Sequence, residues 1–136
     1  MLFKFIISSS FLLTLILFSC GGDNVAMNPG NITYPDSMLS YTQHIRPIFL
    51  DNCVRGNCHG GFRAGGLDLE TDPPNFQSNS GLVVIPFSKT NSLLYILLFV
   101  SDSGIPRMPL DRISGLLDAE KTAIGTWIDE GANPAN

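Results

Sequence analysis

The spacing of hydrophobic residues predicts a first helix near residue 40. Either Ser40 or Thr42 can cap its first turn, and its apolar residues recur at intervals of three or four positions: Tyr41, Ile45, Ile48 and Phe49. Pro47 fits poorly in a helix interior, so the helix either bends there or begins properly near Arg46. After it, residues 60–81 are rich in glycine and proline and are predicted to form an extended loop region.

Two further apolar segments predict helices nearer the C-terminus. Residues 93–100 form an unbroken apolar run that alone fits either a buried strand or a buried helix. Asn91 and Ser92 precede this run and favour a helix, because both residue types are common N-caps. Asp118 is the predicted cap of the last helix and Gly131 its C-terminal stop, with a buried face of Ile124, Trp127 and Ile128.

The most hydrophobic part of the chain is its start. Residues 1–19 carry Lys4 and then a nearly continuous apolar stretch, which is typical of an export signal. The stretch ends in Leu17-Phe18-Ser19-Cys20, which resembles a bacterial lipobox, in which the cysteine is lipidated and becomes the first residue after cleavage. The alternative is an uncleaved anchor, since residues 2–18 are nearly long enough to cross a bilayer when tilted. Both interpretations place the rest of the chain outside the cytoplasm, in the cell envelope, facing the periplasm or the cell surface.

The composition beyond the leader is that of a small acidic domain on a tether. Residues 20–39 are rich in turn formers without periodicity and are predicted to be a flexible lipidated tether, which leaves residues 40–136 as the globular domain. All 13 glycines and all 9 prolines follow the leader, and so loop-rich a domain needs a disulfide, a metal or a cofactor to support its core. Twelve acidic against eight basic side chains exclude nucleic acid as a partner, because binding phosphates requires clustered Lys and Arg.

One segment carries the chemistry: Cys53-Val54-Arg55-Gly56-Asn57-Cys58-His59. Two cysteines followed directly by a histidine are what covalent haem attachment requires, because the thiols add to the two vinyl groups and the neighbouring imidazole ligates the iron. The usual spacing between the cysteines is two residues, whereas here it is four. Gly56 and Asn57 tolerate the unusual backbone angles that the resulting bulge needs.

Three other interpretations of these cysteines remain open. A disulfide between Cys53 and Cys58 would suit an oxidising compartment. A zinc site could use both cysteines with His59 and His44, although adjacent Cys58 and His59 are poorly placed for one tetrahedron. A thioredoxin-like pair would need a two-residue spacing and a helix N-terminus. The third cysteine, Cys20, has no nearby companion, which agrees with lipidation.

A second iron ligand is predicted at Met108, which lies between Pro106 and Pro109. Haem iron with a histidine on one side commonly takes a methionine sulfur on the other, and the prolines would stiffen the loop that presents it. Met108 could instead be a gap-filling core methionine. His44 is the rival ligand and would give a bis-histidine iron.

The order of these segments resembles the small class I-type cytochrome c domains of exported bacterial proteins, especially those of planctomycete-type multidomain proteins and related lipoproteins. The resemblance covers about residues 40–133 and rests on these segments: His44-Ile45-Arg46-Pro47-Ile48-Phe49, Cys58-His59-Gly60, Gly65-Gly66-Leu67-Asp68-Leu69, Ser92-Leu93-Leu94-Tyr95, Arg107-Met108-Pro109 and Trp127-Ile128-Asp129-Glu130-Gly131-Ala132. It implies an all-α, class I-like cytochrome c fold of three to five helices around one covalent haem c. It further implies that the first and last helices cross and that residues 93–100 wall the haem pocket.

The expected function is electron transfer by a membrane-tethered monohaem c-type cytochrome. An iron held by His59 and Met108 leaves no open position for a substrate, so we expect no enzymatic activity. Its expected partners are redox proteins and, through the lipid on Cys20, the membrane. Two alternatives stay open: the haem subunit of a larger oxidoreductase, in which a partner supplies the catalysis, and a disulfide-stapled surface lipoprotein without redox function.

Overall fold

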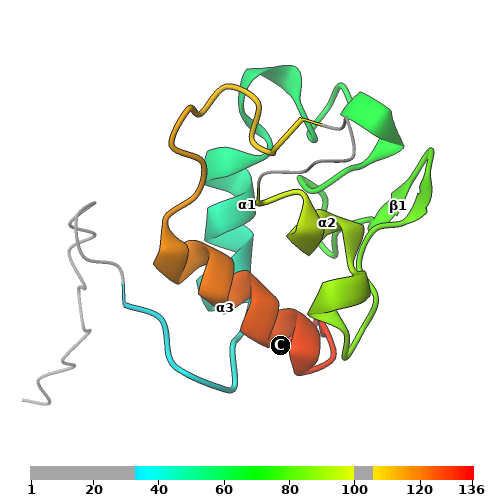
Figure 1. Cartoon of the computed structure of the whole chain (residues 1–136). Helices are drawn as coiled ribbons and strands as arrows, with labels where there is room; N and C mark the ends of the chain where they lie inside the picture. The colour runs from blue at the N-terminus through cyan, green and yellow to red at the C-terminus, as the bar shows by residue number, and fades with distance from the viewer. Residues whose placement is uncertain (1–32, 100–105) are drawn as a thin grey trace, which may run out of the picture.

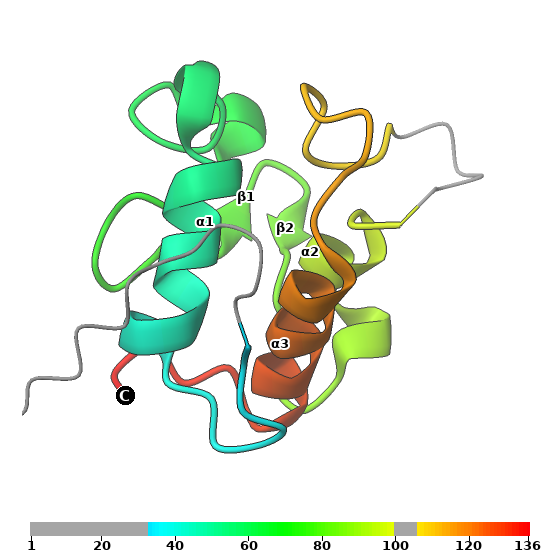
Figure 2. The same cartoon turned by 90° about the vertical axis from the view of Figure 1, so that its left-hand side faces the viewer.

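The computed structural model describes residues 33–99 and 106–136. The predicted leader, residues 1–19, and the predicted lipidation site, Cys20, lie outside the described residues, as does most of the predicted tether. Within the described ranges no helix combines the length and the apolar character that crossing a membrane requires. Figures 1 and 2 show short helices joined by long loops, with a small hairpin on one side.

In the described ranges three α-helices form the frame, and short turns of helix connect them. The elements in chain order are the π-helix η1 (Tyr41–Ile45), α1 (Arg46–Asn52), the 3-10 helices η2 (Arg55–Asn57) and η3 (Ala64–Gly66), the strands β1 (Gln77–Ser78) and β2 (Gly81–Leu82), the 3-10 helix η4 (Lys89–Asn91), α2 (Leu93–Ile96) and α3 (Asp118–Asp129).

The first helix follows the sequence prediction closely. The hydroxyl of Ser40 accepts the backbone N–H of Gln43 at 3.2 Å, which confirms Ser40 as the cap. The α-helical part begins at Arg46, with Pro47 in its first turn, where the missing N–H has no helical partner to lose. The helix ends at Asn52 and so delivers Cys53 directly from a rigid element.

The last helix differs from the prediction at its start. Asp118 is not the cap but the first helical residue, and its carboxylate accepts a hydrogen bond from Lys121 Nζ at 2.8 Å. The N-cap is the residue before it, Leu117. The backbone N–H of Leu117 donates to the carboxylate of Glu120 at 2.8 Å, so a glutamate inside the helix makes the capping hydrogen bond instead of Asp118. Gly131 has a φ of 110°, which confirms it as the C-terminal stop.

The core lies where η1 and α1 cross α3, the arrangement of first and last helices that the resemblance implies. Trp127 is 1% exposed, and its ring centroid lies 5.6 Å from that of Tyr41 and 5.7 Å from that of Phe76. At the other end of the crossing, Asn52 Nδ2 donates to Glu120 Oε1 at 3.4 Å. The end of α1 therefore meets the start of α3, and the two helices run in opposite directions (Figure 2).

The predicted loop region, residues 60–81, leads into a hairpin that the sequence pattern did not predict. Its strands pair antiparallel, with Gln77 opposite Leu82 and Ser78 opposite Gly81. Ser78 donates its hydroxyl to the Gly81 carbonyl at 2.9 Å and closes the turn. Strands of two residues are too short to produce an alternating hydrophobic pattern, which is why they escape a search for periodicity.

The apolar run before residue 100 forms a helix, as predicted, but a shorter one. The helix α2 ends at Ile96, and Val100 lies outside the described residues. Ser92 occupies the cap position, yet its hydroxyl accepts the N–H of Ile85 at 2.8 Å and donates to the Ser88 carbonyl at 2.9 Å. Ser92 therefore fixes α2 to the chain segment before it rather than capping the helix.

Candidate cofactor site

Two adjoining cavities of about 260 and 170 Å³ lie between α1, α2 and the loop that carries Met108. Their common lining is Cys53, His59, Ala64, Gly65 and Met108. Most of the remaining wall of the larger cavity is apolar: Phe49, Leu67, Leu69, Val83, Leu93, Leu94, Leu97 and Leu98. Together the cavities have the size and the apolar character of a site for an organic ligand.

His59 is held with one ring nitrogen bonded to the backbone. Its Nδ1 lies 3.0 Å from the carbonyl oxygen of Ala64. A carbonyl can only accept, so Nδ1 must carry the proton, and Nε2 of the neutral ring keeps its lone pair. Metal-ligating histidines commonly make this second bond, because it fixes the tautomer and the ring orientation.

The backbone of the loop after His59 fixes the position of the Ala64 carbonyl. Three of its residues have left-handed backbone angles: Arg63, Gly65 and Gly66. Arg63 Nε contacts the carboxylate of Asp68 at 2.9 Å, and Asp68 is 4% exposed. Burial alone would raise the pKa of Asp68, but the backbone N–H groups of Thr71 and Glu70, together with the guanidinium of Arg63, hold it below its usual value.

The two cysteines lie next to the cavity as free thiols. Gly56, between them, has a φ of 62°, so the four-residue spacing makes the predicted turn. Burial, with a smaller contribution from the carboxylate of Glu120, raises the pKa of the Cys53 thiol to about 12. Cys53 is therefore protonated at neutral pH. Because both cysteines are free, the alternative of a Cys53–Cys58 disulfide is not formed in this structure.

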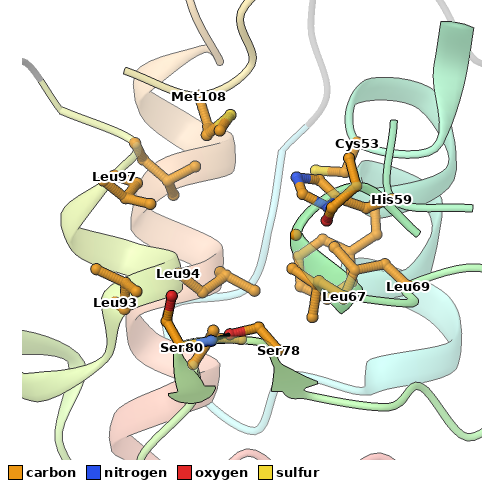
Figure 3. Close-up of a pocket in the computed structure, with 15 residues that line it drawn as sticks. Cys53, His59, Leu67, Leu69, Ser78, Ser80, Leu93, Leu94, Leu97 and Met108 are labelled. Atoms are coloured by element: carbon orange, nitrogen blue, oxygen red, sulfur yellow. Dashed lines mark hydrogen bonds between the residues drawn. The ribbon is translucent and has the colours of Figure 1, made fainter. Parts of the chain in front are cut away.

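Met108 faces the same cavity from the other side. Figure 3 shows its side chain across the cavity from Cys53 and His59. The N–H of Met108 donates to the Leu97 carbonyl at 2.7 Å, which fixes its backbone to the apolar wall.

The rival ligand, His44, lies elsewhere. Its Nδ1 accepts the backbone N–H of Ser40 at 2.9 Å at the start of the first helix, and it does not line either cavity. Among residues 33–99 and 106–136, no three His, Cys, Asp or Glu side chains converge as a zinc site would require. The structure thus brings together Cys53, Cys58, His59 and Met108 and leaves His44 apart.

The other end of the larger cavity is polar, which the sequence pattern did not indicate. Ser78 and Ser80 of the hairpin line it at the end away from the thiols (Figure 3). A haem has vinyl groups on one edge and carboxylates on another, so thiols at one end and hydroxyls at the other match its chemistry. His59 and Met108, on facing walls, carry the imidazole and thioether groups that would hold a haem iron between them.

Comparisons of the chain with protein-family models, curated proteins and solved structures find no match. The assignment of the site therefore depends on the residues themselves. The strongest support is the convergence of four predicted side chains on the two adjoining cavities, since residues 53–59 and Met108 lie about fifty positions apart in the chain.

Proposed function

We propose that this chain is a membrane-tethered monohaem c-type cytochrome that carries electrons. The observation that carries the proposal is the position of His59 and Met108 on facing walls of one apolar cavity, with Cys53 and Cys58 beside it. When bound, a haem supplies the one-electron couple between Fe(III) and Fe(II). The proposed fold is class I-like and all-α around that one covalent group, with the hairpin as a minor addition.

Each residue has a separate role in this proposal. The thiols of Cys53 and Cys58 would hold a haem irreversibly, each S–H adding across the C=C of one vinyl group. His59 would offer Nε2 to the iron, because Nδ1 is bonded to the Ala64 carbonyl. Met108 would offer its sulfur as the second iron ligand. The leucines around α2 exclude water from the cavity, and Met108 closes the axial position that an enzyme would need for a substrate.

The proposed location depends on the part of the chain outside the described residues. The signal-like residues 1–19 and Cys20 support a lipid anchor in the cell envelope, with the domain facing the periplasm or the cell surface. Redox proteins are the proposed partners. The net charge of −4 argues against nucleic acid, because its phosphates would repel an acidic domain.

The test is the absorption spectrum of the full-length chain produced together with haem-attachment enzymes. We expect a red protein whose reduction by dithionite gives the sharp α-band of low-spin haem, and which keeps its colour through acid–acetone extraction. The control is the double variant Cys53→Ala/Cys58→Ala, which should release any haem on extraction. A colourless wild-type protein would overturn the proposal, whether its thiols are free or oxidised.

A further inference from the structure

The side chain of Arg107, next to the candidate ligand Met108, closes the loop formed by residues 107–115. Its Nη2 donates to the carbonyl of Arg112 at 3.1 Å and also to the carbonyl of Ile113. One nitrogen of the guanidinium therefore bonds to two consecutive carbonyls, using both of its N–H groups. The contact joins the residue before Met108 to the far end of the same loop.

Gly115 shows how closely the loop returns to this guanidinium. It has a φ of 70°, and a Cβ built there would lie 3.0 Å from Arg107 Nη1. Its N–H donates to the Arg112 carbonyl at 3.0 Å, so that carbonyl receives bonds from both Arg107 and Gly115. The backbone here is shaped around the arginine, and any side chain at position 115 would press against it.

Burial of apolar side chains holds only part of this loop. Pro109 is buried, but Ile113 is 99% exposed and Leu110 is 63% exposed, so these two residues gain little from the hydrophobic effect. The bonds of Arg107 and the bond between the Met108 N–H and the Leu97 carbonyl then add to the burial of Pro109 in fixing where the Met108 side chain lies.

We propose that Arg107 is a positioning residue that keeps the 107–115 loop closed and so holds the Met108 sulfur at the iron. This inference rests on the proposed function. Without the Arg107 bonds the loop opens more often, and each opening frees the axial position for an external ligand. The sulfur itself is unchanged, so the effect is on how often Met108 leaves the iron.

The experiment measures imidazole binding to the oxidised, haem-loaded protein, because imidazole can bind only after the sulfur has left. We expect Arg107→Gln to bind imidazole about ten- to hundredfold faster than wild type, the factor expected for the loss of two hydrogen bonds. Arg107→Lys keeps the charge but replaces the planar guanidinium by a compact ammonium on a stem of different length, so its rate should lie between the two. The matched control is Arg112→Gln, which removes a positive charge from the same loop while keeping the backbone carbonyl that Arg107 contacts; its rate should stay within about twofold of wild type.

The outcomes separate this inference from the proposed function. A haem-loaded wild type with the near-infrared band of methionine ligation, in which Arg107→Gln binds imidazole no faster than Arg112→Gln, would overturn the role of Arg107 alone. If Arg107→Gln does not fold, Arg107→Lys decides: a rate at least about threefold above that of Arg112→Gln supports the role, and an equal rate overturns it. A wild type without haem, or without that band, would remove the proposed function or its ligand assignment, and the role of Arg107 with it.

Discussion

The carbonyl of Leu97 accepts the N–H of Met108 at 2.7 Å while the Leu97 side chain lines the cavity that Met108 faces. This pair joins the apolar wall of the candidate site to the loop that carries the proposed distal ligand. The backbone of Met108 is thus fixed relative to the cavity, and its flexible side chain needs only to place the sulfur.

Replacing Met108 should therefore change the iron without unfolding the domain. We expect Met108→Ala to lose the near-infrared charge-transfer band of the oxidised protein and to bind carbon monoxide when reduced. Met108→His should stay low-spin with a lower reduction potential, because imidazole favours Fe(III) more than a thioether does. Met38→Ala is the matched control, since Met38 is 86% exposed and does not line the cavity. High-spin iron in His44→Ala but not in Met108→Ala would contradict the assignment.

The thioethers can be counted one at a time. Cys53→Ala and Cys58→Ala should each retain haem through a single bond, and the remaining vinyl group should shift the α-band of the pyridine derivative to longer wavelength. Mass spectrometry of a tryptic digest then locates the haem on the peptide with the remaining cysteine. His59→Ala should yield little matured protein, because it removes the proximal ligand. Equal spectra for wild type and both single variants would rule out two thioethers.

The anchor is tested at Cys20. Cys20→Ser should leave the protein either in the soluble fraction or as an uncleaved precursor, because serine has no thiol to accept the lipid. Metabolic labelling with palmitate, followed by membrane fractionation, measures both effects. A Cys20→Ser protein that still carries the label would show that the lipid is attached elsewhere.

Alkaline pH should destabilise the folded domain. Burial raises the pKa values of Tyr34 and Tyr41 from 10.0 to about 12, so between pH 10 and 12 the unfolded chain has released phenolic protons that the folded chain still holds. The free energy of unfolding must therefore fall as pH rises through this window. Urea unfolding of the haem-loaded protein at a series of pH values measures the slope, which should be shallower in Tyr41→Phe.

The same variant tests the cost of a buried hydroxyl. Tyr41 is fully buried, and its hydroxyl has no hydrogen-bond partner in the described part of the molecule. At neutral pH we expect Tyr41→Phe to be within about 1 kcal/mol of wild type or more stable, because it removes an unpaired polar group while keeping the ring. Tyr41→Ala, the control for lost packing, should cost about 3–5 kcal/mol. A loss of several kcal/mol in Tyr41→Phe would mean that the hydroxyl does have a partner.

Acid should weaken the loop that orients His59. The pKa of Asp68 is lower in the folded chain than its ordinary value. The Asp68 carboxylate therefore stabilises the fold fully at pH values above the ordinary pKa, and this stabilisation is lost as the pH falls through the lowered pKa. Asp68→Asn should remove this part of the acid dependence, leaving a flatter stability profile below about pH 4. Circular dichroism at decreasing pH measures the profile for both proteins. Identical profiles would show that Asp68 does not contribute.

Sequence patterns predicted the elements whose signals are local. The cap at Ser40, the start of α1 near Arg46 and the stop at Gly131 follow from single-residue chemistry, and the structure has all three. The cap at Asp118 was wrong because two acidic residues compete there: the Glu120 side chain reaches back to the Leu117 N–H, while Lys121 binds Asp118.

The candidate site was predictable for side chains and not for backbone groups. The four proposed haem contacts are rare residue types in an informative order, so the sequence indicates them. The Ala64 carbonyl and the carbonyls that Arg107 contacts leave no such trace, because every residue has a carbonyl and only the folded loop decides where it points. The glycine pair Gly65-Gly66 was a local hint of such a loop, and the structure gives both residues a positive φ.

The carboxylate of Glu130, just beyond α3, accepts the backbone N–H groups of both Met38 and Leu39. In Figure 1 the red C-terminal end of α3 lies away from the yellow-orange loop that follows residue 105. A mechanical pull on the residues before Tyr34 would load two contacts in turn: the packing of Tyr34 against the core, and then the Glu130 carboxylate at the end of α3. If the chain is held at a membrane through its N-terminus, these two contacts take up the motion of that surface before it reaches the residues around His59.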